Sequence, residues 1–498
     1  MAVFVGCDLG TMGTKAAVVD EEGHILGQAF EEVALRTPAP GRVEQDLEEI
    51  ERSAQRTIAE ALAGSGRAAD VAGLAFSSQM SGIGAVDDDF RPAVHFDSWL
   101  DTRCAPYIAA MSEHADRVTE LSGCPPTYSH GPKILWWRQE RPADYARIAR
   151  FVVPSAFVAA RVCGLGVADA FIDRTTVHFS NLSDTEHCVW SQELLDAFGL
   201  DEGVLPRIVD PLDIVGKVTA AAAEATGLPA GTPVAAGAGD QAAASLGAGV
   251  VEAGQAFDSA GTASVFAICI DRFAPDLERQ TVLASHSIVA GTYIALAFIN
   301  GGGLALRWFR DQIARVGPDA AAYPALDAEA AAVEPGAGGL LWFPHIQGCV
   351  LPPEPNARGA FVGLTSGHTR GHLFRAILEG IAYEYALWAD RAPGPLTEAR
   401  VLGGGARSSL WNRIKADVLG IDWLPAVRQE CGVLGDALVA AAATGHVRDL
   451  AATAKAWQET GPPVHPDPLR HERYRALREA YRELHRLGPA FDRLSEAT

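Results

Sequence analysis

The chain has 498 residues, which is too many for one ordinary hydrophobic core, so we expect at least two domains. Its formal net charge of −21 argues against a nucleic-acid or anionic-membrane surface, because both require clustered basic residues. We find neither an apolar stretch of membrane-spanning length nor a secretory signal, since Asp8 interrupts the apolar start of the chain. The eight cysteines form no CxxC pair, which is typical of reduced thiols in a cytoplasmic protein.

The first feature in chain order is a strand, a glycine-containing turn and a second strand. Residues 2–7 are mostly apolar, residues 8–15 read Asp-Leu-Gly-Thr-Met-Gly-Thr-Lys, and residues 16–20 are again mostly apolar. Glycines allow backbone N–H groups to approach a phosphate, and threonine hydroxyls add donors. The turn is therefore a candidate phosphate loop. An ordinary hairpin turn is the alternative.

Two polar segments follow the next predicted elements, a helix over 46–63 and a strand over 71–77. The strand leads into Gln79-Met80-Ser81-Gly82, and polar residues at a strand exit are candidates for ligand contact. Further on, Trp99, Asp101 and Arg103 combine a stacking surface with polar groups, which suits a polyhydroxylated ligand. A salt bridge beside a packed indole explains the same three residues equally well.

The central stretch, Gly237 to Gly249, reads GAGDQAAASLGAG and follows a predicted buried strand over 232–236. Ligands of α/β proteins collect at the carboxyl ends of strands, so Asp240 is a candidate general base. Asp240 is also a good residue for capping the short helix that we expect to end at Gly247. The same stretch formally matches a dinucleotide fingerprint, with Asp258 as the acidic partner, although that acid falls where a new hairpin begins.

A second strand–turn–strand pattern begins near the middle of the chain. Residues 255–259 and 265–270 flank a turn that contains Gly261, Thr262 and Ser264. Because this arrangement repeats that of the first hairpin, an internal duplication into two related α/β lobes is the economical account. Two such hairpins that face one cleft are suited to hold a nucleotide's phosphates from both sides.

The remainder of the chain is predicted to be largely helical. Residues 401–409 form a glycine-rich strand exit, where a flat aromatic ligand can lie against the backbone, so this is a candidate adenine and ribose site. His368 and His372 have a spacing that can bind metal, but a solvated helix start explains them without a third ligand. We expect helices over 305–313, 370–389, 410–419, 432–445 and 467–487, the fourth packing closely because it has little side-chain bulk and the last lying on the surface.

Eight segments in the same order resemble the FGGY carbohydrate kinases of the actin, Hsp70 and sugar-kinase superfamily, most closely the xylulokinase-like branch. They are DLGTMGTK, SSQMSG, SWLDTR, AAGAGDQAAASLGAG, DSAGTASVF, NARGAFVGL, VLGGGARSSLWNRIKADVLG and GVLGDALVAAA. The resemblance implies two RNase H-like lobes with a cleft between them, placed at 1–247 and 248–450 and followed by a helical tail over 451–498. It also implies ATP and Mg²⁺ as cofactors and a small sugar as substrate.

The resemblance assigns roles residue by residue. Asp240 is implied as the catalytic base, and Asp8 and Asp240 as the acids at the metal. The implied sugar contacts are Gln79, Met80, Ser81, Trp99, Asp101, Arg103 and Gln241. The implied ATP contacts are Gly10, Thr11, Gly13, Thr14, Lys15, Gly261, Thr262, Gly404, Gly405, Ala406 and Ser409.

Two segments depart from the xylulokinase pattern. Ser81 stands where these kinases usually have His, and Cys349-Val350 stands where they have Glu-Arg. From the resemblance as a whole, we expect ATP-dependent phosphorylation of a ketopentose such as xylulose. Another ketose or polyol (ribulose, erythritol or a glycerol-like compound) and a non-catalytic ATP-binding sensor are the alternatives. A homodimer is compatible with the sequence, and no nucleic-acid or membrane partner is expected.

Overall fold

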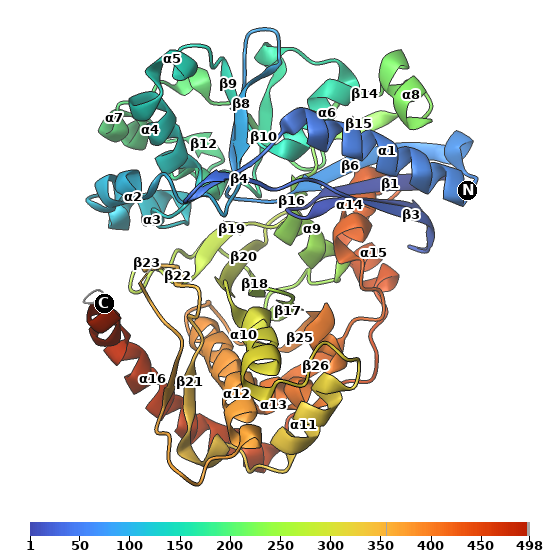
Figure 1. Ribbon diagram of the computed structural model, residues 1–498. Helices are drawn as coiled ribbons and strands as arrows, with labels where there is room; N and C mark the ends of the chain where they lie inside the picture. Colours follow the sequence, from blue (N-terminus) through green and yellow to red (C-terminus); the bar gives the residue numbers. More distant parts are fainter. Residues whose placement is uncertain (355, 496–498) are drawn as a thin grey trace. The chain divides into compact units, whose positions relative to one another are not determined.

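The computed structural model describes residues 1–354 and 356–495 (Figure 1). These residues form two compact units. Unit 1 contains residues 1–252, 271–294 and 430–458, and unit 2 contains residues 253–270, 295–429 and the chain from 459 onward. The predicted lobes are continuous segments. In the structure, residues 430–458 instead pack with unit 1, although they follow most of unit 2 in the chain. The last three residues of the predicted tail, 496–498, and residue 355 lie outside the described residues.

The main sheet of unit 1 is built around the predicted first hairpin. Strands β1 and β2 pair antiparallel from Val3↔Asp20 to Leu9↔Thr14, and β1 pairs parallel with β6. The sheet has the order β14 (Ile214–Lys217), β15 (Pro233–Ala235), β6 (Val71–Ser78), β1 (Val3–Leu9), β2 (Gly13–Asp20) and β3 (Ile25–Glu32), and β16 (Ala238–Gly239) also pairs with β6. The strand predicted before the central stretch is therefore confirmed in this sheet.

A second sheet, two small sheets and a set of helices complete unit 1. The small sheets pair β10 (Phe171–Asp173) with β13 (Arg207–Val209) and β11 (Ser183–Asp184) with β12 (Val189–Trp190). The second sheet has the order β4 (Arg36–Ala39), β5 (Arg42–Gln45), β8 (Pro92–Asp97), β7 (Ile83–Val86) and β9 (Arg150–Val152). The helices are α1 (Leu47–Ser65), α2 (Ala105–Ser112), α3 (Ala115–Ser122), α4 (His130–Glu140), α5 (Pro142–Tyr145), α6 (Pro154–Cys163), α7 (Gln192–Phe198), α8 (Ala220–Thr226), α9 (Asp240–Gly247), α14 (Cys431–Ala443) and α15 (Leu450–Trp457).

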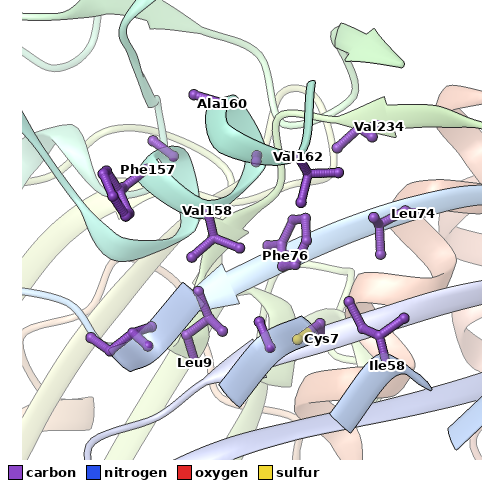
Figure 2. Packing of buried hydrophobic residues seen from close by; sticks show 14 of the residues in the cluster. Cys7, Leu9, Ile58, Leu74, Phe76, Phe157, Val158, Ala160, Val162 and Val234 are labelled. Atoms are coloured by element: carbon purple, nitrogen blue, oxygen red, sulfur yellow. The ribbon is translucent and has the colours of Figure 1, made fainter. Parts of the chain in front are cut away.

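Alternation along β1 separates the hydrophobic core from a second face. Val3, Val5, Cys7 and Leu9 point into a core shared with β6, α1 and α6, and Figure 2 shows Phe76 of β6 packed beside Val158 and Val162 of α6. Successive side chains of a strand point to opposite faces, so Phe4, Gly6 and Asp8 face away from this core. Helix α14 covers that opposite face, because the position of a Cβ on Gly6 lies 2.1 Å from the carbonyl oxygen of Val433.

The main sheet of unit 2 repeats the strand order of unit 1. Five of its strands have the order β20 (Tyr293–Ile299), β18 (Ser264–Ile270), β17 (Gln255–Ala260), β25 (Glu398–Leu402) and β26 (Asp422–Pro425), which corresponds to β3, β2, β1, β6 and β15 in unit 1. In both units the first hairpin is antiparallel and its first strand pairs parallel with the next strand of the sheet. The repeated order supports the predicted duplication.

The helices predicted for the second half of the chain are present, with shifted ends. Helix α12 spans Arg370–Ala389 as predicted, and the helix expected over 467–487 is α16 (Pro468–Ser495). The helix expected over 305–313 is α10 (Gly302–Trp308), which continues as a π-helical turn over Phe309–Ala314. Unit 2 also contains α11 (Ala322–Ala331), α13 (Ser409–Leu419) and the short strands β21 (Leu341–Phe343), β22 (Cys349–Val350), β23 (Pro353–Glu354) and β24 (Ala360–Val362). Within the described residues, we find no helix with the length and apolar character needed to cross a membrane.

Helices α9 and α14 approach each other through glycines. A Cβ on Gly435 of α14 would lie 1.9 Å from the carbonyl oxygen of Ala243, and one on Gly247 of α9 would lie 1.9 Å from that of Cys431. Real Cβ atoms do not approach a backbone oxygen this closely, so the two backbones must separate if either glycine gains a side chain. The prediction that 432–445 packs closely is confirmed.

We predict that Gly435→Ala lowers the free energy of unfolding by about 1–3 kcal/mol, because inserting a methyl group into a filled contact forces the backbones apart. Gly64→Ala in α1 is the matched control, since a Cβ there meets only the Cα of Gly27 at 3.9 Å. The control should be neutral or stabilising by up to about 1 kcal/mol, as alanine favours a helix over glycine. Urea unfolding of both variants is the measurement, and equal midpoints would contradict the packing argument.

Candidate active site

Asp240 is the first residue of α9, directly after the short strand β16. The turn before it requires glycine, because Gly237 has a φ of 79° and a Cβ there would lie 1.9 Å from the carbonyl oxygen of Phe76. The amide of Gly239 donates to Thr175 Oγ1 at 3.0 Å, which holds the start of the helix. Gly239, and not Asp240, occupies the N-cap position. The capping alternative for Asp240 is therefore not what the structure shows.

The charge of Asp8 raises the pKa of two other buried carboxylates at this end of the sheet of unit 1, Asp240 and Asp436. Burial and then the charge of Asp8 raise the pKa of Asp240 to about 7. The pKa of Asp8 is raised to about 6, chiefly by burial and with a smaller contribution from Glu430, while Lys15 opposes the shift. Burial, followed by the charges of Asp8 and Asp240, raises the pKa of Asp436 well above its ordinary value. Removal from water and a neighbouring negative charge both disfavour the ionised form of a carboxyl group.

Asp436 lies on α14 and was assigned no role in the sequence, although it belongs to a segment that resembles the family. Its side chain is fully buried, and Ser77 Oγ donates to its Oδ2 at 2.9 Å. The same hydroxyl lies 3.4 Å from Asp8 Oδ1, so one serine of β6 joins the acids of β1 and α14. The sequence signal that could have identified Asp436 is its place as a single acid within the alanine-rich stretch 432–445.

This group of acids suits a hard divalent cation. Oδ1 of Asp240 and Oδ1 of Asp436 are enclosed and have no hydrogen-bond partner among the residues that the structure describes. Carboxylate oxygens are the ligands that Mg²⁺ prefers, and a cation offsets the repulsion between neighbouring carboxylates. The predicted metal residues Asp8 and Asp240 therefore fit such an ion, and Asp436 extends the set.

The predicted phosphate turn closes as a hairpin between β1 and β2. The amide of Gly10 donates to the carbonyl oxygen of Gly13 at 3.0 Å. Lys15 forms an ion pair with Glu430 of the same unit. Thr14 is buried and its hydroxyl contacts Ser53 Oγ of α1 at 2.6 Å, so its side chain stabilises the hairpin from the core side. Only the backbone of Thr14 is therefore available for the predicted ATP contact.

A polar network joins this turn to the predicted sugar residues. Trp99 Nε1 donates to Thr11 Oγ1 at 2.8 Å, and that hydroxyl donates to Gln79 Oε1 at 3.2 Å. Gln45, which the sequence did not indicate, accepts from Gln79 Nε2 at 2.6 Å and donates to the carbonyl oxygen of Thr11 at 3.1 Å. The structure therefore brings Thr11, Gln79 and Trp99 together from three distant segments.

Met80 packs against the turn that precedes Asp240, and Ser81 follows it in the chain. A Cβ on Gly239 would lie 2.6 Å from the sulfur of Met80, so the methionine packs directly on the residue before Asp240. Ser81 has a φ of 66°, and its hydroxyl donates to the carbonyl oxygen of Tyr128 at 3.1 Å. The buried Lys133, a residue that the sequence did not indicate, donates to the carbonyl oxygen of Ser81 at 3.2 Å.

Asp101 and Arg103 form the salt bridge that was the alternative to a direct ligand contact. Asp101 is 0% exposed and accepts from the amide of Val43 at 2.7 Å. The Arg103 guanidinium lies 2.6 Å from Asp101, 2.7 Å from Glu44 and 3.0 Å from Asp97. In this arrangement, both residues anchor the loop that presents Trp99. Gln241, the remaining predicted sugar residue, follows Asp240 on α9, and its Oε1 is enclosed without a partner in the described part of the chain.

Unit 2 contains a pocket of ≈ 660 Å³. Most of the ATP-binding residues that were predicted within unit 2 line this pocket. Gly261 and Thr262 line it from the second hairpin, and Gly404 and Gly405 line it from the glycine-rich strand exit. Ala406 and Ser409 are not among its lining residues, whereas the intervening Arg407 and Ser408 are, together with Arg307, Arg310, Tyr323 and Asp327. Ser408 Oγ donates to Asp327 Oδ2 at 2.7 Å, which fixes one wall.

Two alternative interpretations of the sequence fail on geometry. The dinucleotide fingerprint requires Asp258 to be available for a ribose, but Asp258 is fully buried, forms an ion pair with Lys415 and accepts from the hydroxyl of Tyr385 at 2.7 Å. His368 and His372 belong to a helix start, since His372 takes part in a capping box with Thr369. Asp258 therefore stabilises the core of unit 2, and the two histidines have a structural role at the start of the helix.

We predict that Asp436→Asn reduces the loss of stability at rising pH. A carboxyl whose folded pKa is raised above the ordinary value of about 3.9 supports the folded state at low pH, and this contribution is lost as the pH rises through its folded pKa. Without divalent cations, the urea midpoint of the variant minus that of the wild type should therefore increase as the pH is raised above about 4, the ordinary pKa of an aspartate. Asp88→Asn on the exposed β7–β8 turn is the control, and parallel curves for Asp436→Asn and the wild type would contradict the coupling.

The sequence and the fold are both similar to those of known sugar kinases. A xylulose kinase of Escherichia coli is 28% identical over 97% of this chain and 98% of its own length, and a gluconokinase of Bacillus subtilis is 26% identical over 89% and 88%. The crystal structure of a xylulose kinase from Rhodospirillum rubrum matches with a TM-score of 0.89 at 27% identity, covering 98% of this chain and 99% of that one.

Family models agree with these similarities over nearly the whole chain. The N-terminal domain of the FGGY family of carbohydrate kinases matches residues 3–247, and the C-terminal domain of the same family matches residues 257–444. The matches include the turn with Asp8, the helix start with Asp240 and the strand exit at Gly404. The chain belongs to the FGGY family of carbohydrate kinases, and it is a carbohydrate kinase.

Proposed function

We propose that this kinase transfers the terminal phosphoryl group of ATP to a hydroxyl of a ketopentose, with xylulose as the first candidate. The observation on which the proposal depends is the carboxylate of Asp240, which has an enclosed oxygen without a hydrogen-bond partner among the residues that the structure describes, and a pKa raised to about 7 by burial and by Asp8. The names of the most similar relatives support a sugar acceptor, and both xylulose and gluconate occur among them. The eight free cysteines support a cytoplasmic location.

Asp240 acts as the general base in this proposal. A base works best when its pKa lies near the operating pH, because a substantial fraction of it is then ionised and the ionised form still accepts a proton readily. The carboxylate of Asp240 takes the proton of the attacking hydroxyl as the bond to phosphorus forms. Phosphoryl transfer requires little further covalent chemistry from the protein, and the remaining residues position the reactants.

Asp8, Asp240 and Asp436 would hold Mg²⁺, which neutralises phosphate charge when it is bound. Gly10, Thr11, Gly13 and Lys15 of the first turn and Gly261 and Thr262 of the second are the proposed phosphate contacts. The pocket lined by Gly404 and Gly405 is the proposed adenosine site. Its position after a strand that ends in glycines lets a flat base approach the backbone.

The sugar is proposed to contact Met80, Ser81, Trp99, Gln79 and Gln241. Trp99 supplies an apolar face, while the amides supply donors and acceptors for hydroxyl groups. Asp101 and Arg103 hold this surface in place through their ion pair. Because the Ser81 hydroxyl already donates to Tyr128, it offers the sugar an acceptor oxygen.

We predict that the purified protein forms ADP from MgATP in the presence of one sugar in a panel of pentuloses, hexuloses, polyols and gluconate, with xylulose giving the highest kcat/KM. Coupled ADP detection with each compound is the measurement, and ATP alone gives the background. ATP binding without stimulation by any compound would instead identify the non-catalytic sensor.

We predict that Asp240→Asn lowers kcat by at least about 100-fold, because general-base catalysis contributes about 10²- to 10⁴-fold. ATP affinity, measured by calorimetry without Mg²⁺, should change little, since the adenosine pocket belongs to unit 2. Asp88→Asn is the control for a lost exposed charge and should retain full activity. If Asp240→Asn keeps wild-type turnover, the proposed base is wrong.

We predict that Gly404→Leu raises the KM for ATP by about 10-fold or more while the KM for the sugar changes little, because the new side chain occupies the adenosine pocket. A Cβ at this position meets only the carbonyl oxygen of Ala260 at 3.9 Å, so the backbone tolerates it. Gly367→Leu in the exposed loop before α12 is the control. An unchanged KM for ATP would place the nucleotide elsewhere.

A further inference from the structure

The C-terminal helix α16 is attached to α12 by two buried tyrosine–glutamate pairs. Tyr474 donates to Glu379 Oε1 at 2.7 Å. About two turns further along α16, Tyr481 donates to Glu384 Oε1 at 2.6 Å. Both tyrosines and both glutamates are almost fully buried. The two pairs differ in their surroundings. Arg375 lies beside Glu379, whereas two histidines lie beside Glu384.

The two histidines come from separate elements and converge on the same carboxylate. His345 follows β21 and is 7% exposed, and the side chain of His485, on α16, is 32% exposed. One ligand atom from each of His345, Glu384 and His485 lies within 4.8 Å of the other two. The imidazole of His485 lies 3.6 Å from Glu384 Oε2. Phe343 packs against both imidazoles, with ring centroids 4.5 Å and 5.6 Å away.

We propose that His345, Glu384 and His485 form a Zn²⁺ site that fastens α16 to the body of unit 2. Two imidazoles and one carboxylate are a common ligand set for this ion, with water in the fourth position. Bonds of about 2.0–2.1 Å in a tetrahedron place ligand atoms about 3.3 Å apart. The three atoms therefore need to approach by about 1.5 Å at most, which side-chain rotation supplies.

The surroundings of the three residues are those of a metal ligand set. The Tyr481 hydroxyl holds one oxygen of Glu384 and leaves Oε2 directed toward His485. Hydrogen bonds of this kind orient ligating carboxylates, and removing one commonly costs 10- to 100-fold in metal affinity. The hydrogen bond from the Tyr481 hydroxyl also favours the ionised form of Glu384, which is the form that ligates a metal.

The proposed site is separate from the kinase machinery. All three residues belong to unit 2, and none lines the pocket with Gly404. Another group of potential ligands, Asp20, Glu22 and His24, lies in unit 1, but two of its three members are exposed. That group serves as an internal comparison for adventitious binding.

The test is a Zn²⁺ titration of the full chain, freed of any affinity tag, in competition with a chromophoric chelator. We expect one tightly bound Zn²⁺ per chain and a loss of affinity greater than about 100-fold in His345→Gln and His485→Gln, since losing a ligand costs more than losing its orienting partner. Circular dichroism should show that both variants remain folded, and their kinase activity should be unchanged.

Tyr481→Phe and Tyr474→Phe are a matched pair on the same helix. Tyr481→Phe should weaken Zn²⁺ binding by about 10- to 100-fold, whereas Tyr474→Phe, which removes the equivalent bond at Glu379, should leave it unchanged. Equal weakening by the two variants would mean that general loosening of α16 is responsible, and it would overturn the proposal. Retention of binding in the double variant His345→Gln/His485→Gln, or its loss in His24→Ala, would also overturn it.

Discussion

The close approach of α14 to strand β1 is the constraint on which the acidic site depends. Gly6 has no side chain, and a Cβ there would lie 2.1 Å from the carbonyl oxygen of Val433 and 2.9 Å from the Cβ of Asp436. The absence of that one atom allows Asp436 to enter the space beside Asp8. Burial removes hydration from each carboxylate and raises its pKa, and the charge of Asp8 adds to the shift at Asp240 and at Asp436. The fold thus gathers three acids at a place that suits a cation and a proton acceptor.

The two hairpins show how a duplicated element can serve different purposes. Asp8 on β1 and Asp258 on β17 both lie in the first strand of their unit's hairpin, and each strand pairs parallel with the next strand of its sheet. Asp8 faces a further acid, Asp436. Asp258 is instead neutralised by Lys415 and held by the Tyr385 hydroxyl. The first copy is therefore suited to bind a cation, while the second stabilises the core of its unit.

Regular patterns made much of the fold predictable from the sequence. The two hairpins and the strand before the central stretch follow from apolar runs beside glycines, and the structure has all three as well as the predicted helix over 370–389. Motif order also led to the family. What could not be predicted depends on contacts between distant segments. Asp436, Gln45 and Lys133 gain their positions only when helices and loops pack, and local spacing did not distinguish an ion pair of Asp101 and Arg103 from a sugar contact.

The coupling of the three carboxylates can be measured directly by NMR of protein labelled with ¹³C at the aspartate carboxyl carbon, titrated without divalent cations. The account predicts one resonance that titrates near pH 7 in the wild type, is absent in Asp240→Asn and shifts to lower pH in Asp8→Asn because the neighbouring charge of Asp8 is gone. A second resonance, near pH 6, should be absent in Asp8→Asn. If every aspartate titrates near its ordinary value of about 4, the carboxylates are independent and the central claim is wrong.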